Sequence, residues 1–204
     1  MTYKWLNVYT GYKYLMDVIE WTKYIYPGKE FAYSTSLNFD HKQLLYASVN
    51  VSPKLGIFRP TWGFYYKQQF FDTRKYGASK ALSRPLLLCL LDNNFALSET
   101  MNAAISLNAA TPNADGFLMM KSNYSVDLRF DKSFANRTWI IYLSANDIFK
   151  TTKERWTMYG QGSGTMKDCY NYTRSISLQV TYNFNAKRSK YKGTGAGNEE
   201  KSRL

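Results

Sequence analysis

Apolar and polar residues alternate with a period of two along most of the chain, rather than with the 3.6-residue period of a helix. The clearest example is residues 174–185, where serine, glutamine, threonine and asparagine separate the apolar positions. Those positions are Ile176, Leu178, Val180, Tyr182 and Phe184. Such alternation predicts a strand with one apolar and one polar face.

Further segments repeat the pattern, giving about eight strands of roughly ten residues each. Helix signals are nearly absent, and residues 17–26 fit a helical turn, a strand or an ordered loop equally well. We therefore predict an all-β fold. The other predicted strands are residues 3–12, 43–52, 61–71, 85–95, 100–110, 123–133 and 138–146.

Short and long connections alternate along the chain. The short ones are residues 53–60, 96–98 and 135–137; the long polar ones are residues 11–42, 72–84, 111–116 and 150–173. In an antiparallel up-and-down sheet, alternate connections lie at the same end. Transmembrane β-barrels have this asymmetry, with short periplasmic turns and longer extracellular loops. Strands of about ten residues are also long enough to cross the hydrocarbon when tilted. The pattern therefore predicts transmembrane barrel strands.

A soluble β-barrel or sandwich would alternate in the same way, with its polar face in water. The 18 Tyr, 12 Phe and 5 Trp residues favour the membrane interpretation, because they cluster near strand ends, as in residues 62–66. Transmembrane barrels carry aromatic girdles at those positions. The longest apolar run, residues 86–91, is too short for a transmembrane helix.

The net charge of +12 raises the possibility of a nucleic-acid partner. The basic residues do not gather on one element, however, and residues 185–204 alone hold six basic and two acidic residues. Lys and Arg at a membrane interface can extend toward anionic headgroups, which accounts for the surplus. We predict no nucleic-acid partner.

Residues suited to catalysis or metal binding are few. One His and two distant cysteines, Cys89 and Cys169, do not form the Cys/His cluster of a structural zinc site. His41 has no nucleophile nearby in the sequence, and the glycines of residues 193–197 lack the spacing of a phosphate-binding loop. We predict no enzyme activity, no cofactor and no bound metal.

Three charged residues, Asp127, Arg129 and Asp131, fall on one face of the strand predicted at residues 123–133. An Arg that faced hydrocarbon would cost about 2–4 kcal/mol at the bilayer midplane. We therefore expect the row to face the barrel lumen. Its members are expected to pair with one another, the alternative being contact with a plug domain or a passing substrate.

Several segments closely resemble the outer membrane β-barrel family of Bacteroidetes-type bacteria, which is related to TonB-dependent receptors. The most specific is the carboxyl end, residues 182–204, and the resemblance covers most of the chain. The other segments are Gly11-Tyr12-Lys13-Tyr14, Lys132-Ser133-Phe134, residues 143–149 and residues 174–178.

The resemblance implies a longer protein with an export signal, a plug region and a barrel of about 22 strands. Residues 1–185 would then be the carboxyl-terminal part of the barrel and residues 186–204 a basic, Gly-containing periplasmic tail. The chain shows no signal peptide of its own, so we expect a gene fragment, a mis-assigned start or a stand-alone barrel.

The resemblance also implies a location in the Gram-negative outer membrane and a role in nutrient uptake or binding. Expected partners are outer-membrane lipid, the barrel-insertion machinery, upstream barrel and plug sequence of the same receptor, and a surface lipoprotein. The lipid-facing side of the last strand, Ile176 to Phe184, resembles the assembly signal of such barrels. Two alternatives remain open: a soluble β-barrel binding module, and a small autonomous outer-membrane barrel acting as an adhesin or structural protein.

Overall fold

The computed structural model describes residues 2–25, 28, 30, 32–78, 81–161 and 164–184. The tail predicted at residues 186–204 lies outside the described residues, as does Asn185. No helix in the described part of the chain is long and apolar enough to cross a membrane.

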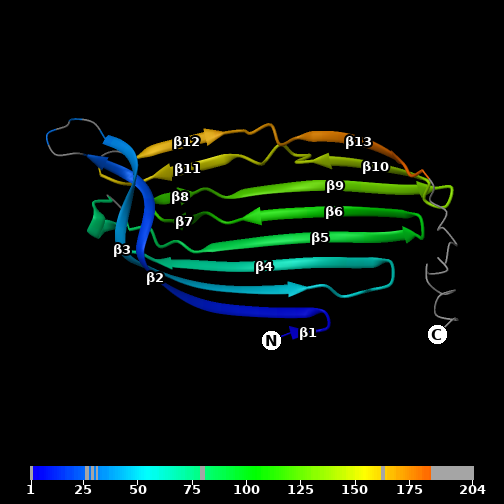
Figure 1. Cartoon of the computed structure of the whole chain (residues 1–204), viewed down its shortest axis with the longest axis horizontal. Helices are drawn as coiled ribbons and strands as arrows, with labels where there is room; N and C mark the ends of the chain where they lie inside the picture. Colours follow the sequence, from blue (N-terminus) through cyan, green and yellow to red (C-terminus); the bar gives the residue numbers. More distant parts are fainter. Residues whose placement is uncertain are drawn as a thin grey trace, which may run out of the picture.

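The described residues form a large antiparallel sheet of nine strands in the order β1-β2-β3-β4-β5-β6-β9-β10-β13 (Figure 1). This confirms the all-β, up-and-down prediction, because neighbouring strands of the large sheet also follow one another along the chain. The strands missing from this order, β7, β8, β11 and β12, form a second sheet. The strands of the large sheet are β1 Thr2–Tyr3, β2 Leu6–Ile25, β3 Ala32–Val51, β4 Phe58–Phe70, β5 Leu86–Ser98, β6 Met101–Ala110, β9 Asn123–Phe134, β10 Trp139–Asn146 and β13 Ser175–Tyr182.

A second, four-stranded sheet lies beyond one end of the large sheet (Figure 1). It is built from the segments predicted as polar loops at residues 111–116 and 150–173 and their neighbours. Its order, β12-β11-β8-β7, continues the order of the strands to which it is joined. The strands are β7 Asn113–Asp115, β8 Leu118–Met120, β11 Glu154–Met158 and β12 Thr165–Cys169, and a short 3-10 helix, η1, spans Thr73–Tyr76.

The two ends of the large sheet differ as the connection lengths predict. At the tight-turn end, Phe134 pairs with Trp139, and Ala135, Asn136 and Arg137 adopt the positive φ angles of a compact turn. The turn predicted at residues 96–98 lies slightly later, because β5 continues to Ser98. The opposite end, here called the loop end, carries the small sheet and η1 (Figure 1).

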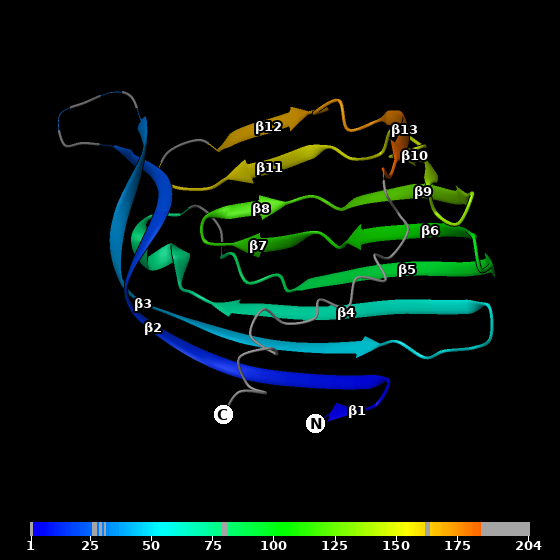
Figure 2. The same ribbon diagram turned by 45° about the vertical axis from the view of Figure 1, so that its right-hand side comes forward.

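The long connection predicted at residues 11–42 is wrong, because these residues extend β2 and β3 into a hairpin with 20 residues in each strand. Asp17 has a φ of 52°. Lys42 and Phe39 of the opposite strand are both buried although they are three residues apart, so the side of the hairpin that faces the protein interior changes near this point. The distal half of the hairpin curls across the loop end (Figure 2), where Trp21 packs edge-on against Trp156 with ring centroids 5.8 Å apart.

The cluster of buried apolar residues in the described part of the chain lies at the loop end. Aromatic rings from β3, the segment after β4 and the β7–β8 turn meet there, with the centroids of Phe39 and Phe117 5.2 Å apart. The cluster consists of Phe39, Phe71, Ala78, Leu82, Ala114 and Phe117. Most of the large sheet therefore leaves both faces accessible, and the composition of those faces becomes the informative feature.

Candidate functional site

One face of the large sheet is apolar across all eight of its long strands. Cross-strand partners point to the same side of a sheet, so the register assigns side chains to faces. One row runs from Val49 through Phe64, Cys89 and Ala109 to Tyr124. We call the side that carries this row the apolar face.

The last strand places its predicted apolar side chains on this face. Leu178 is opposite Leu143 and Val180 is opposite Ile141, while Ile176 is opposite Ala145. Ile176 is 79% exposed and Leu178 68% exposed. A row of large exposed apolar side chains is rare in water, where contiguous apolar patches mark interfaces with proteins or membranes.

Aromatic rings lie at both ends of the apolar face. At the tight-turn end, the Tyr182 ring lies 4.4 Å from that of Trp139 and 4.5 Å from that of Phe184, centroid to centroid. Toward the loop end, Tyr14 stacks on His41 at 5.4 Å. Leu143 and Leu178 lie at the centres of β10 and β13, but the aromatic side chains Phe64 and Phe130 also lie well inside their strands. The aromatic distribution predicted from the sequence therefore holds only in part.

The opposite side, here called the polar face, carries the predicted charged row. The members of this row bond to neighbouring residues rather than to one another, so the prediction of mutual pairing is wrong. Arg129 donates to Asn94 Oδ1 at 2.9 Å, and Asp131 accepts from Asn102 Nδ2 at 2.7 Å. Asp127 accepts from the backbone N–H of Asp147 at 2.7 Å.

A further carboxylate extends this network across three strands. Asp92 of β5 accepts from Asn94 Nδ2 at 3.0 Å and from Ser106 Oγ of β6 at 2.8 Å. Asn94 therefore links Asp92 to Arg129 of β9. In the sequence, Asp92 and Asn94 stand out as polar residues that follow the apolar run of residues 86–91. Their proximity to Arg129 becomes apparent only from the pairing of the strands.

A cluster of tyrosines interrupts the polar face near β2, β3 and β4. The hydroxyls of Tyr9 and Tyr46 are 3.4 Å apart and their ring centroids 5.7 Å apart, while Tyr65 donates to Asn50 Oδ1 at 3.2 Å. Lys13 Nζ lies 5.5 Å from the centre of the Tyr46 ring. These residues are here called the tyrosine patch, and all of them except Asn50 line a cavity of about 450 Å³ together with Leu44, Leu86 and Leu88.

The tyrosine patch depends on a glycine. A Cβ atom at Gly11 would lie 2.6 Å from Cζ of Tyr46, so only glycine lets the ring lie this close to β2. Apolar ring faces beside a few polar groups are typical of small-molecule sites. Sequence reasoning missed this site, because its members come from separate strands.

An ion network joins the polar face to the loop end. Lys42 Nζ lies 2.6 Å from Glu20 Oε1 and 3.3 Å from Asp115 Oδ1, and Lys67 Nζ lies 2.8 Å from Asp115 Oδ2. Beside it, the buried Gln69 side chain accepts from the Gly116 N–H and donates to the Gly116 and Leu82 carbonyls. The network fixes the β2–β3 hairpin against β7 and β4.

A scan against protein-family models matched residues 1–182 to the outer membrane protein beta-barrel family. The chain belongs to this family. Searches of curated proteins and of solved structures returned no match. Membership of the outer membrane protein beta-barrel family places the protein in the outer membrane as a membrane barrel protein, and it agrees with the alternating faces of the large sheet.

Other polar residues of this outer-membrane barrel protein sit in structural contacts. Asp147 is buried after β10, and its carboxylate accepts from the N–H groups of Thr151 and Thr152 and from Thr173 Oγ1. In the small sheet, hydrogen bonds from Lys167, Trp156 and Asn171 lower the pKa of Glu154 to about 2. Both carboxylates hold the loop end together in their charged form.

The residues considered for chemistry lie apart from one another. His41 stacks on Tyr14, Cys89 lies on the apolar face and Cys169 lies in β12, and both cysteines are free thiols. Among the described residues, no group of three or more His, Cys, Asp or Glu side chains is arranged to hold a metal ion.

Proposed function

We propose that this chain forms part of the wall of an outer-membrane barrel that binds or imports a nutrient, in the manner of TonB-dependent receptors. In this arrangement the apolar face contacts lipid and the polar face lines the lumen. The tight-turn end lies in the periplasm and the loop end outside the cell. The observation that carries the proposal is the exposed apolar face backed by a hydrogen-bonded polar face, as transmembrane barrels require.

The two outer edges of the sheet support a barrel larger than this sheet. Within the described residues, β2 pairs on its outer side only through Leu6 and Asn7, and β13 pairs only with β10. Backbone groups left unpaired in hydrocarbon cost several kcal/mol each. We infer that further strands complete the barrel and that, as in TonB-dependent receptors, they come from upstream sequence together with a plug.

The polar face supports a role in binding. The tyrosine patch offers ring faces and hydroxyls to a solute in the lumen, and the network of Asp92, Asn94 and Arg129 offers further hydrogen-bonding groups beside it. A surface lipoprotein partner would bind at the loop end. The barrel-insertion machinery would bind the edge of β13 that is unpaired within the described residues, including the aromatic residues at its end. No catalytic role is proposed for any of these residues.

Growth on single limiting nutrients tests the proposal. A strain that lacks the intact protein should grow poorly on one class among glycans, iron-loaded siderophores and peptides. The wild-type gene should restore growth, but not in a strain whose inner-membrane energising complex is inactive. Normal growth on every class would overturn the uptake role in favour of an adhesin or structural barrel. Recovery of the protein in the soluble fraction without detergent would instead favour a soluble binding module.

A further inference from the structure

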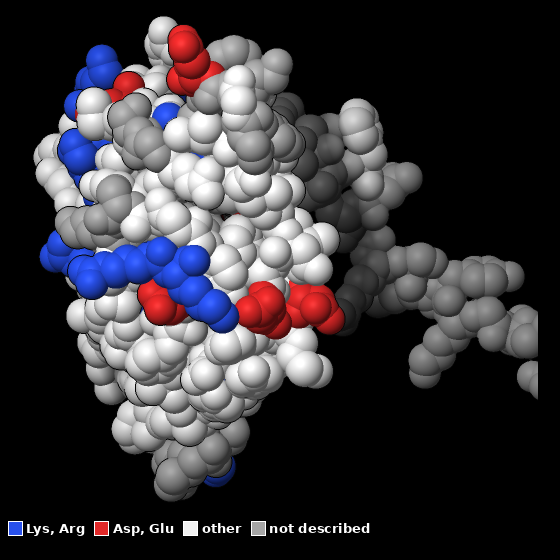
Figure 3. All heavy atoms as spheres, turned by 90° about the vertical axis from the view of Figure 1, so that its left-hand side faces the viewer, with Lys and Arg blue, Asp and Glu red and all other residues white. Residues whose placement is uncertain are grey.

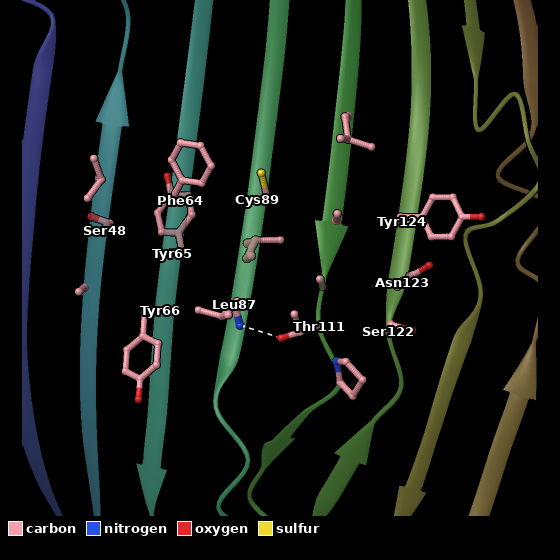
Figure 4. A pocket seen from close by; sticks show the side chains of 17 residues that line it. Ser48, Phe64, Tyr65, Tyr66, Leu87, Cys89, Thr111, Ser122, Asn123 and Tyr124 are labelled. Carbon is pink, nitrogen blue, oxygen red and sulfur yellow. Dashed lines mark hydrogen bonds between the residues drawn. The ribbon is translucent and has the colours of Figure 1, made fainter.

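The apolar face contains a groove of about 660 Å³. Figure 4 shows Phe64 and Tyr66 of β4 along one side and Tyr124 of β9 along the other, with Leu87 and Cys89 of β5 between them. Its volume falls in the range of about 300–1,000 Å³ typical of small-molecule sites.

Small side chains create the groove. Cys89 and Ala109 are partners in the register, and they lie between the much larger Phe64 and Tyr124 in the same row. In the next row toward the loop end, Ala47 lies opposite Tyr66. The sheet surface is therefore low between the aromatic side chains of Phe64 and Tyr124.

The groove is almost free of polar groups. Nearly all of its accessible surface is apolar, and at its loop end Thr111 Oγ1 accepts from the Leu87 N–H at 2.9 Å (Figure 4). A polar solute would find few partners in it. An acyl chain would bury apolar surface at about 25 cal/mol per Å² without losing hydrogen bonds.

Two exposed cationic residues lie close in the sequence to residues at the loop end of the groove. Arg84 lies three residues before Leu87, and its carbonyl accepts from the Ala114 N–H at 2.9 Å, which holds it close to the groove residues Thr111 and Pro112. Lys121 immediately precedes Ser122, which lines the groove. Neither cation forms an ion pair within the described residues. Figure 3 shows a band of Lys and Arg side chains across the loop end, with Asp and Glu side chains beside it.

We propose that the groove is a binding site for one lipid of the outer leaflet, with an acyl chain between Phe64 and Tyr124 and an anionic headgroup at Arg84 and Lys121. The proposal rests on the orientation given under the proposed function, since it needs the apolar face in lipid and the loop end outside. The charge at the mouth favours an anionic lipid over a second copy of the chain, which would carry the same cations to the contact.

Native mass spectrometry of the intact protein, with phosphatidylglycerol or phosphatidylcholine of identical acyl chains added to the delipidated sample, tests this site. The wild type should retain one phosphatidylglycerol tightly and phosphatidylcholine more weakly. Ala109→Phe fills the groove and should weaken retention about tenfold, equivalent to about 1.4 kcal/mol. Arg84→Gln with Lys121→Gln should abolish the preference for the anionic lipid. The matched control is Ala145→Phe, on the same face but outside the groove, which should retain lipid like the wild type.

Equal lipid retention by Ala109→Phe and the wild type would overturn the proposal. A dimer that forms without lipid and is lost in Ala109→Phe would overturn it in favour of self-association. Heat-modifiable migration on a denaturing gel, measured for each variant, distinguishes failure of the lipid-site proposal from failure of the barrel proposal. Only a closed barrel stays folded in detergent without heating and so migrates differently before and after heating.

Discussion

Replacing Leu143 by arginine is expected to destabilise the protein in a bilayer by about 2–4 kcal/mol, the cost of a cation at the midplane of a lipid-facing barrel surface. Leu143 lies at the centre of β10 on the apolar face, opposite Phe130 on one side and Leu178 on the other. The arginine would have no nearby carboxylate in that row and would be surrounded by hydrocarbon. Equilibrium folding into lipid vesicles, followed in urea, measures the difference.

The neighbouring residue provides the matched control. Tyr142 lies on the polar face, opposite Asp131 and Gln179. Tyr142→Arg would place the same charge beside a carboxylate, in a lumen that contains water. Its effect should stay below about 1 kcal/mol, as for an exposed ion pair. Equal losses for Leu143→Arg and Tyr142→Arg would contradict the assignment of the two faces.

Replacing Lys42 by methionine is expected to destabilise the loop end by about 3 kcal/mol. The Lys42 side chain is 6% exposed and its partner Glu20 19% exposed, so removal of the cation leaves a largely desolvated carboxylate without compensation. Breaking a buried pair in this way costs about 3–5 kcal/mol, and partial exposure places this one at the lower end. Limited proteolysis of the β2–β3 hairpin, calibrated by urea, measures the loss.

A second lysine at the loop end makes the comparison specific. Lys75 pairs with Asp40 at 3.1 Å, but the two side chains are 58% and 68% exposed. Lys75→Met should therefore cost less than about 1 kcal/mol, because water replaces the partner. If Lys42→Met proved as mild as Lys75→Met, the network around Lys42 would not fix the hairpin.

Alternation is local information, and for that reason the faces of the membrane strands could be predicted from the sequence. Alternation is visible within residues 174–185 and within residues 123–133 taken separately. The strand register confirms that the apolar side chains of both segments lie on one face of the sheet. Residues 11–42 were misread because the alternation changes phase within them, although both strands of the hairpin belong to the large sheet. Beyond Asp17 it packs on a protein core at the loop end, so the inward-facing side of the hairpin changes.

The candidate site was less predictable, because its contacts join distant parts of the chain. The charged row was found from a single strand, but its partners Asn94 and Asn102 lie on β5 and β6. Tyr65 was grouped with interface aromatics, whereas the register turns it to the polar face. Lys42 and Asp115 are 73 residues apart, and no local pattern links them.

A nitroxide scan of residues 139–146 tests the central claim most directly, that one face of the sheet meets lipid and the other water. Each position would carry a single spin-labelled cysteine in the Cys89→Ala, Cys169→Ala protein, reconstituted in vesicles. Collision with oxygen, which dissolves in lipid, should peak at residues 139, 141, 143 and 145. Collision with a water-soluble nickel chelate should peak at 140, 142 and 144. Equal accessibility at all positions, or the opposite phase, would contradict the account.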